Sequence, residues 1–164
     1  MKKQFLLISL FFLFGLVAIQ AQTYDKAIGA RLGYPLSVSY KTFLNESSAV
    51  EVFAGTRGFS GYRWISLSGA YQIHKPLSAA NTDGLNFYYG AGASVYFWSY
   101  DNDFIDNSSS TSIGLQGYLG LDYSLKDTPI NFTVDWIHTF IINGFGSGFG
   151  AGYGSLGVRY ILSR

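Results

Sequence analysis

The sequence predicts an all-β protein, an eight-stranded antiparallel up-and-down transmembrane β-barrel. Three observations lead to this expectation. Two long stretches alternate strictly, the chain is rich in glycine and aromatic residues, and no long apolar run follows the N-terminal region. Within 85–98 every odd position is apolar or aromatic, and within 111–126 one face is apolar apart from Gly117. Period-2 alternation indicates extended strands with two different faces, and such long strands are typical of transmembrane β-barrels.

The composition supports this fold class. The chain has 20 glycines and 18% aromatic residues. Glycine lets strands curve and leaves space inside a narrow barrel, while Tyr and Trp favour the membrane interface. In lipid, a closed barrel is the alternative to a helix for satisfying every backbone polar group.

The N-terminus has the pattern of a secretory signal peptide. Lys2 and Lys3 precede an apolar run from Phe5 to Ile19, and the small residue Ala21 follows. The alternative is a membrane-anchoring helix, for which this run is short. We therefore expect residues 1–21 to be a cleaved signal peptide and residues 22–164 to form the barrel in the outer membrane of a Gram-negative cell.

Charge and cysteine content narrow the function classes. With no cysteine, the exported chain is expected to rely on packing and hydrogen bonds. A net charge of +1 gives no electrostatic reason to expect a nucleic-acid partner. We expect neither a cofactor nor a metal.

The expected strands of the N-terminal half alternate apolar residues with small or polar ones. In the first, Ile28 and Leu32 lie opposite Arg31, and Pro35 then interrupts the strand, so a tight turn is expected. The polar stretch that begins at Asn45 predicts another turn. These strands are expected at 27–34, 36–43, 49–56 and 63–74, with a glycine-rich loop at 57–61.

The C-terminal half continues in the same way. Phe132 and Trp136 share one face of the seventh expected strand, while Asn131 and Asp135 share the other. The strands are expected at 85–98, 111–126, 130–142 and 153–162, and the links at 75–84, 99–110, 127–129 and 143–152. The 99–110 link is the most polar, and the last link is glycine-rich. An even number of strands puts both termini on one side, so the links after strands one, three, five and seven are expected to be extracellular.

Six charged residues fall on the polar faces of the expected strands: Arg31, Lys41, Glu51, Asp122, Asp135 and Arg159. Unpaired charge in a narrow interior is costly, and eight strands enclose a space that side chains just fill. We predict an interior plugged by ion pairs and by tyrosine or glutamine hydrogen bonds, with Asp135, Arg159 and Arg31 in one cluster. The expected role is structural; a proton or ion relay is the alternative.

Other candidate residues carry weaker signals. His138 falls on the lipid-facing side among aromatic residues, without a nucleophile or acid on the same face of its strand. His74 precedes Lys75-Pro76 and is expected to be a solvated turn residue. Two separated histidines do not make a zinc site. The aspartates at 101, 103 and 106 are more typical of a solvated loop than of a calcium site.

The chain resembles small outer-membrane β-barrels of the OmpA and OmpX type, especially those of Bacteroidota. The most telling segments are 85–92, 130–136 and 157–160, and the last is similar to the C-terminal signal read by the barrel-assembly machinery. Because the sequence ends at Arg164 and not on an aromatic residue, recognition would rest on Tyr160 or be less efficient. The resemblance implies a location and a fold, but no reaction.

We therefore expect a non-enzymatic, porin-like membrane barrel with a structural or surface-interaction role through its loops, chiefly 99–110 and 57–61. Its expected partners are outer-membrane lipid, the barrel-assembly machinery and an unknown extracellular ligand. Two alternatives are an outer-leaflet lipid-modifying enzyme and a soluble lipocalin-like binder of an apolar ligand. The second requires the opposite polarity, with apolar residues inside.

Overall fold

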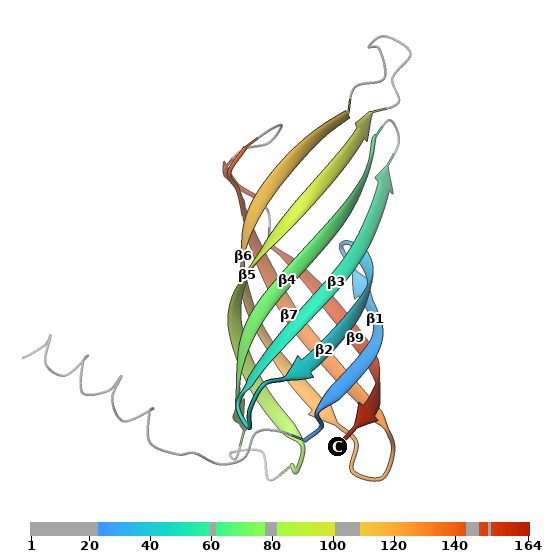
Figure 1. Ribbon diagram of the computed structural model, residues 1–164, viewed down its shortest axis with the longest axis vertical. Helices are drawn as coiled ribbons and strands as arrows, with labels where there is room; N and C mark the ends of the chain where they lie inside the picture. Colours follow the sequence, from blue (N-terminus) through green and yellow to red (C-terminus); the bar gives the residue numbers. More distant parts are fainter. Residues whose placement is uncertain (1–22, 60–61, 78–81, 101–108, 144–147, 151) are drawn as a thin grey trace, which may run out of the picture.

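The computed structural model describes residues 23–59, 62–77, 82–100, 109–143, 148–150 and 152–164. The expected signal peptide lies outside these residues. The described chain forms nine β-elements (Figure 1). They are β1 (Lys26–Gly33), β2 (Leu36–Phe43), β3 (Ser48–Phe59), β4 (Tyr62–Pro76), β5 (Leu85–Tyr100), β6 (Ser109–Ser124), β7 (Ile130–Ile141), β8 (Gly148–Phe149) and β9 (Tyr153–Ser163). Among the described residues, no helix is long and apolar enough to cross a membrane.

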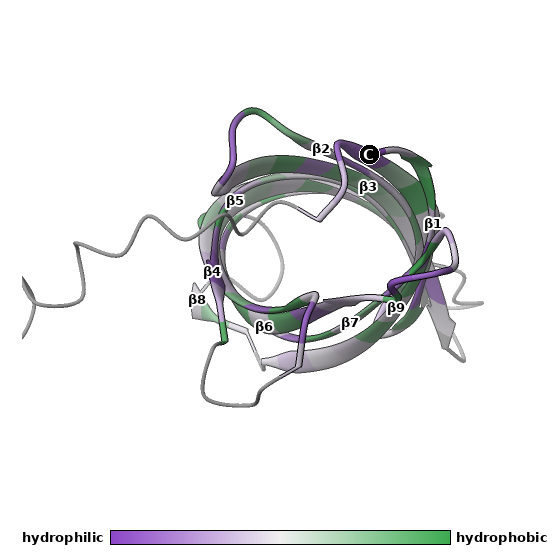
Figure 2. Cartoon of the chain, turned by 90° about the horizontal axis from the view of Figure 1, so that it is seen from below, coloured by the Kyte–Doolittle hydropathy of each residue, from purple (hydrophilic) through white to green (hydrophobic). Residues whose placement is uncertain are grey.

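Eight of these elements form a closed antiparallel barrel. Strands β1 to β6 pair in chain order, β9 pairs with β1 and β7, and the β6–β7 pairing closes the ring. Figure 2 shows this ring along the barrel axis. The two-residue β8 pairs with the end of β7 through Phe140 and Phe149, beyond the part of β7 that pairs with β9. The predicted all-β, eight-stranded fold is confirmed.

The barrel is taller on one side than on the other. β1 and β2 have 8 residues each, whereas β4, β5 and β6 have 15, 16 and 16. A tilted strand of about 9–11 residues crosses a bilayer, so β4 to β6 are long enough to project beyond it. The start of β1 and the C-terminus lie at one end, here called the termini end, and the long strands project at the other, the distal end (Figure 1).

The strand faces have the polarity expected of a membrane barrel. On β6 the side chains of Leu115 and Leu119 are 53% and 48% exposed, whereas Gln116 and Asp122 are 4% and 0% exposed. The other barrel strands also alternate exposed apolar with buried polar residues. The outer surface is therefore apolar and the interior is polar.

Some links differ from expectation because strand pairing extends further than the sequence pattern suggested. The expected loop at 57–61 is largely strand, since Arg57 pairs with Trp64 and Gly58 with Arg63. The β8 pairing falls inside the expected 143–152 loop. The turn at Asn45 is confirmed, because its Oδ1 accepts the backbone N–H groups of Ser47 and Ser48. Most of the 99–110 loop lies outside the described residues.

Leu119→Arg tests the polarity of the outer surface. We expect a loss of about 2–4 kcal/mol in the free energy of unfolding, because the charge would face hydrocarbon. Urea unfolding in phospholipid vesicles measures this loss, with Leu119→Ala as the control for the lost leucine side chain. An arginine variant as stable as the alanine variant would contradict an outward-facing Leu119.

Candidate functional site

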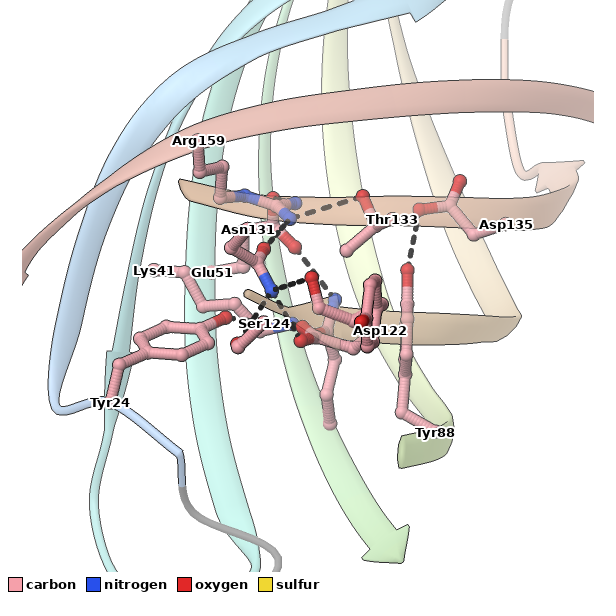
Figure 3. A network of polar contacts seen from close by, with 12 residues as sticks. Tyr24, Lys41, Glu51, Tyr88, Asp122, Ser124, Asn131, Thr133, Asp135 and Arg159 are labelled. Carbon is pink, nitrogen blue, oxygen red and sulfur yellow. Dashed lines mark hydrogen bonds and ion pairs between the residues drawn. The ribbon is translucent and has the colours of Figure 1, made fainter. Parts of the chain in front are cut away.

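The six charged residues singled out in the sequence all point into the barrel. They come from β1 (Arg31), β2 (Lys41), β3 (Glu51), β6 (Asp122), β7 (Asp135) and β9 (Arg159), and none is more than 4% exposed. Inward positions on different strands meet because the barrel is narrow. Figure 3 shows five of them together with their polar neighbours.

Glu51 lies between two arginines. Its Oε1 accepts a bond from Nη1 of Arg31 at 3.2 Å and one from Nη2 of Arg159. Arg31 also reaches Asp135, with Nη2 at 2.7 Å from each carboxylate oxygen. The expected cluster of Asp135, Arg159 and Arg31 therefore has a fourth member. Glu51 contacts both arginines, although its strand β3 pairs with neither β1 nor β9.

A second group of contacts surrounds Asp122 near the termini end. Nζ of Lys41 lies 3.0 Å from Oδ2, and Nδ2 of Asn131 donates to Oδ1. The Tyr24 hydroxyl donates to Oδ2 at 3.1 Å. Tyr24 precedes β1, and burial raises the pKa of its phenol well above the ordinary value, so it stays protonated as a donor.

Neutral side chains complete the coordination of the charges. Nε2 of Gln72 donates to Oε2 of Glu51 at 2.9 Å, and the Tyr88 hydroxyl donates to Asp135. Gly120 of β6 leaves the space that the Tyr88–Asp135 contact occupies. A Cβ at Gly120 would lie 2.7 Å from the Cβ of Asp135 and 2.8 Å from the Tyr88 ring.

Closer to the distal end, the interior is filled by a neutral network centred on Gln116. Its Nε2 donates to the hydroxyls of Tyr96, Thr139 and Tyr153, and its Oε1 accepts from Ser94. These residues come from β5, β6, β7 and β9, so the network crosses the barrel. Charged and neutral networks follow one another along the interior.

The expectation for His74 was wrong. Its side chain is 1% exposed and points inward, stacked on Tyr88 at 5.0 Å between ring centroids and tilted against Phe43 at 4.8 Å. The sequence placed it at a strand end because Lys75-Pro76 follows. However, β4 continues to Pro76, and His74 has the same inward parity as Gln72.

His138 faces outward, as expected. Its ring contacts Trp136 at 6.3 Å and Phe149 at 5.6 Å between centroids. The backbone partner of His138 on β6 is Gly117, which has no side chain to offer a nucleophile or an acid. An interfacial aromatic environment suits an outward-facing histidine.

No group of three or more potential metal ligands was found among the described residues. The three aspartates at 101, 103 and 106 lie outside them. Sequence reasoning did not single out Tyr24, Tyr88 or Asn131. For Tyr88 and Asn131 the polar face of the strand was a usable signal, whereas Tyr24 lies outside any expected strand.

Glu51→Gln tests whether the central carboxylate compensates the two arginines. We expect a loss of about 3–5 kcal/mol in the free energy of unfolding, because two buried guanidinium groups would lose their shared negative charge. Urea unfolding in vesicles measures the loss. Asp83→Asn is the control, since its pair with Lys126 is 3.8 Å long and exposed, and such pairs contribute little. Equal stability of the two variants would contradict the arrangement.

No protein-family model and no curated protein sequence matches the chain. Solved structures do match. Neisserial surface protein A has a TM-score of 0.62 and 19% identity, covering 84% of this chain and 94% of that chain. The N-terminal β-barrel domain of Pseudomonas aeruginosa OprF has a TM-score of 0.64 and 14% identity, covering 85% and 98%.

The chain is also similar to Ail, the attachment invasion locus protein of Yersinia pestis, with a TM-score of 0.55 and 14% identity, covering 83% of this chain and 95% of that chain. At these identities the matches establish the architecture. The chain has the fold of the small eight-stranded outer-membrane β-barrels.

Proposed function

We propose that this protein is an integral outer-membrane barrel with a side-chain-filled interior and a structural or surface-interaction role. The observation that carries the proposal is its polarity. Apolar side chains face outward on the barrel strands, while Arg31, Glu51 and Arg159 are buried and paired inside. This distribution suits a chain surrounded by lipid and leaves the interior occupied.

The same polarity contradicts the lipocalin-like alternative. A soluble carrier of an apolar ligand requires an apolar interior and a hydrated outer face. Here Leu115, Leu119 and Leu121 are 53%, 48% and 41% exposed, and the largest fully buried side chains include two arginines.

The lipid-modifying enzyme finds little support. Catalysis by a histidine requires a nucleophile and an orienting carboxylate within hydrogen-bond reach. The outward-facing ring of His138 lies against Trp136 and Phe149. These rings supply apolar contact area and no acid.

The sidedness follows from export. With residues 1–21 as a cleaved signal peptide, the termini end faces the periplasm and the distal end faces outward. The links at 34–35, 60–61, 101–108 and 142–152 are then extracellular. Insertion by the barrel-assembly machinery is part of this proposal.

The composition of the most polar outward link favours one class of partner. Residues 99–110 include three aspartates and neither lysine nor arginine. One Ail structure contains the heparin analogue sucrose octasulfate, but like charges would repel a sulfated sugar from this link. We propose that it meets a partner with basic groups.

The occupied interior predicts electrical behaviour. Purified protein in a planar bilayer is expected to show no large, steady conductance, because buried side chains and ion pairs cross the barrel. A 16-stranded porin in the same bilayer is the positive control. A stable, large conductance at low voltage would contradict a filled interior.

The 99–110 link is expected to be needed for binding but not for folding of the barrel. Joining Ser99 to Ser109 through an Asn-Gly turn is expected to preserve the heat-modifiable gel mobility, because these two residues are the last pair of β5 with β6. Retention of the vesicle-inserted protein on immobilised polylysine should fall. The triple variant of residues 101, 103 and 106 to Asn is the matched control and should lose the same binding. Failure of the shortened protein to insert would contradict a role limited to binding.

A further inference from the structure

Three polar residues near the termini end have buried atoms without a hydrogen-bond partner among the described residues. These atoms are Oε1 of Gln72, both ring nitrogens of His74 and Nδ2 of Asn86. The residues are 0%, 1% and 3% exposed. Leaving one such group unpaired costs about 1–3 kcal/mol, so several together point to a ligand that pairs with them.

The three residues lie along one inward row, with His74 between the other two. Gln72 and His74 are two residues apart on β4, and His74 pairs in register with Tyr88 of β5. Asn86 is two residues before Tyr88, which makes it the diagonal neighbour of His74 at about 7–8 Å between backbone positions. A small molecule can therefore bridge His74 to Gln72 on one side and to Asn86 on the other.

The donors and acceptors among these unpaired atoms indicate which ligand fits. A neutral imidazole offers one donor and one acceptor, the Gln72 oxygen accepts, and the Asn86 amide nitrogen donates. A cation would need acceptors alone, and an anion would need donors alone. Water does both, and buried water usually makes about three hydrogen bonds to such groups.

The segment before β1 crosses the barrel end beside this group. The backbone N–H of Asp25 donates to Ser163 of β9, and its carbonyl accepts from Phe43 of β2, both at 2.8 Å. On the opposite wall, the Tyr24 and Thr23 hydroxyls donate to Asp122 and Ser124 of β6 at 3.1 and 2.8 Å. In the ring of strands β2 and β6 lie opposite each other, so the segment spans the opening.

Tyr24 connects this crossing segment to the unpaired group. Its ring is 1% exposed and lies edge-on to Phe43, with 5.1 Å between centroids. Phe43 in turn lies 4.8 Å from His74. The close-up in Figure 3 shows Tyr24 with its hydroxyl directed toward Asp122 from the end of the barrel.

We infer that Gln72, His74 and Asn86 form a buried water-binding site at the termini end of the barrel, and that Tyr24 seals it from bulk solvent. The seal consists of an aromatic ring held on one side by Phe43 and on the other by its hydrogen bond to Asp122. Removal of this ring opens a path for solvent to the site.

Nuclear magnetic resonance tests the water. The folded protein in detergent micelles, with labelled histidine, asparagine and glutamine, is expected to show cross-peaks between water and the side-chain N–H groups of His74 and Asn86. The Gln116 side-chain amide is the internal control, because its Nε2 already has three protein acceptors. Absence of water cross-peaks at both His74 and Asn86 would overturn the site.

Cysteine chemistry tests the seal, because the chain has no cysteine of its own. Asn86→Cys is expected to react slowly with a small methanethiosulfonate reagent, and at least tenfold faster when combined with Tyr24→Ala. Asp83→Cys, at an exposed position, should react fast in both backgrounds. Equal rates for Asn86→Cys with and without Tyr24→Ala would overturn the seal.

Tyr24→Phe keeps the ring and removes the hydroxyl, so the rate of Asn86→Cys should stay within about threefold of the slow value. A rate as fast as with Tyr24→Ala would overturn the ring as the barrier. Heat-modifiable mobility identifies the folded fraction of each variant, and rates are measured on that fraction.

Discussion

The need to pair charge away from water governs the interior of this barrel. Three cationic and three anionic residues point inward from the strands, and Glu51 bridges the guanidinium groups of Arg31 and Arg159. An isolated buried charge costs far more than a neutral polar group. The carboxylates must therefore lie within contact distance of the cations. This requirement constrains the register of β1, β3, β7 and β9 together. Small residues such as Gly120 provide the space these contacts occupy.

The two ends of the interior are built differently. Near the termini end, ionic contacts around Asp122 lie next to aromatic rings and to polar atoms that have no hydrogen-bond partner within the described part of the chain. Toward the distal end, the network around Gln116 contains hydroxyl and amide groups whose pairing needs no charge. The height of the barrel also changes around the ring, since β4 to β6 are about twice as long as β1 and β2.

Much of the fold could be predicted because the alternation between Leu119 and Asp122 and their neighbours has a period of two, and this period is a local property of the chain. Strand ends were harder to predict. β3 continues through Arg57 and Gly58 because β4 supplies backbone partners, which no local pattern records. The prediction of a solvated turn at His74 was wrong for the same reason. The proline two residues later suggested a turn, but pairing with β5 extends β4 to that proline and holds the histidine inside.

The sequence by itself determined which side of each strand faces lipid and which six charges turn inward, because side-chain direction alternates along any extended chain. Only the tertiary structure decided their partners. Arg159 and Glu51 lie 108 residues apart in the chain, on strands that do not pair with each other, and their contact depends on the order and curvature of the closed ring. The position of Tyr24 across the barrel end was likewise decided by long-range contacts with Asp122 and Phe43, since the three residues before β1 have no periodic pattern of their own.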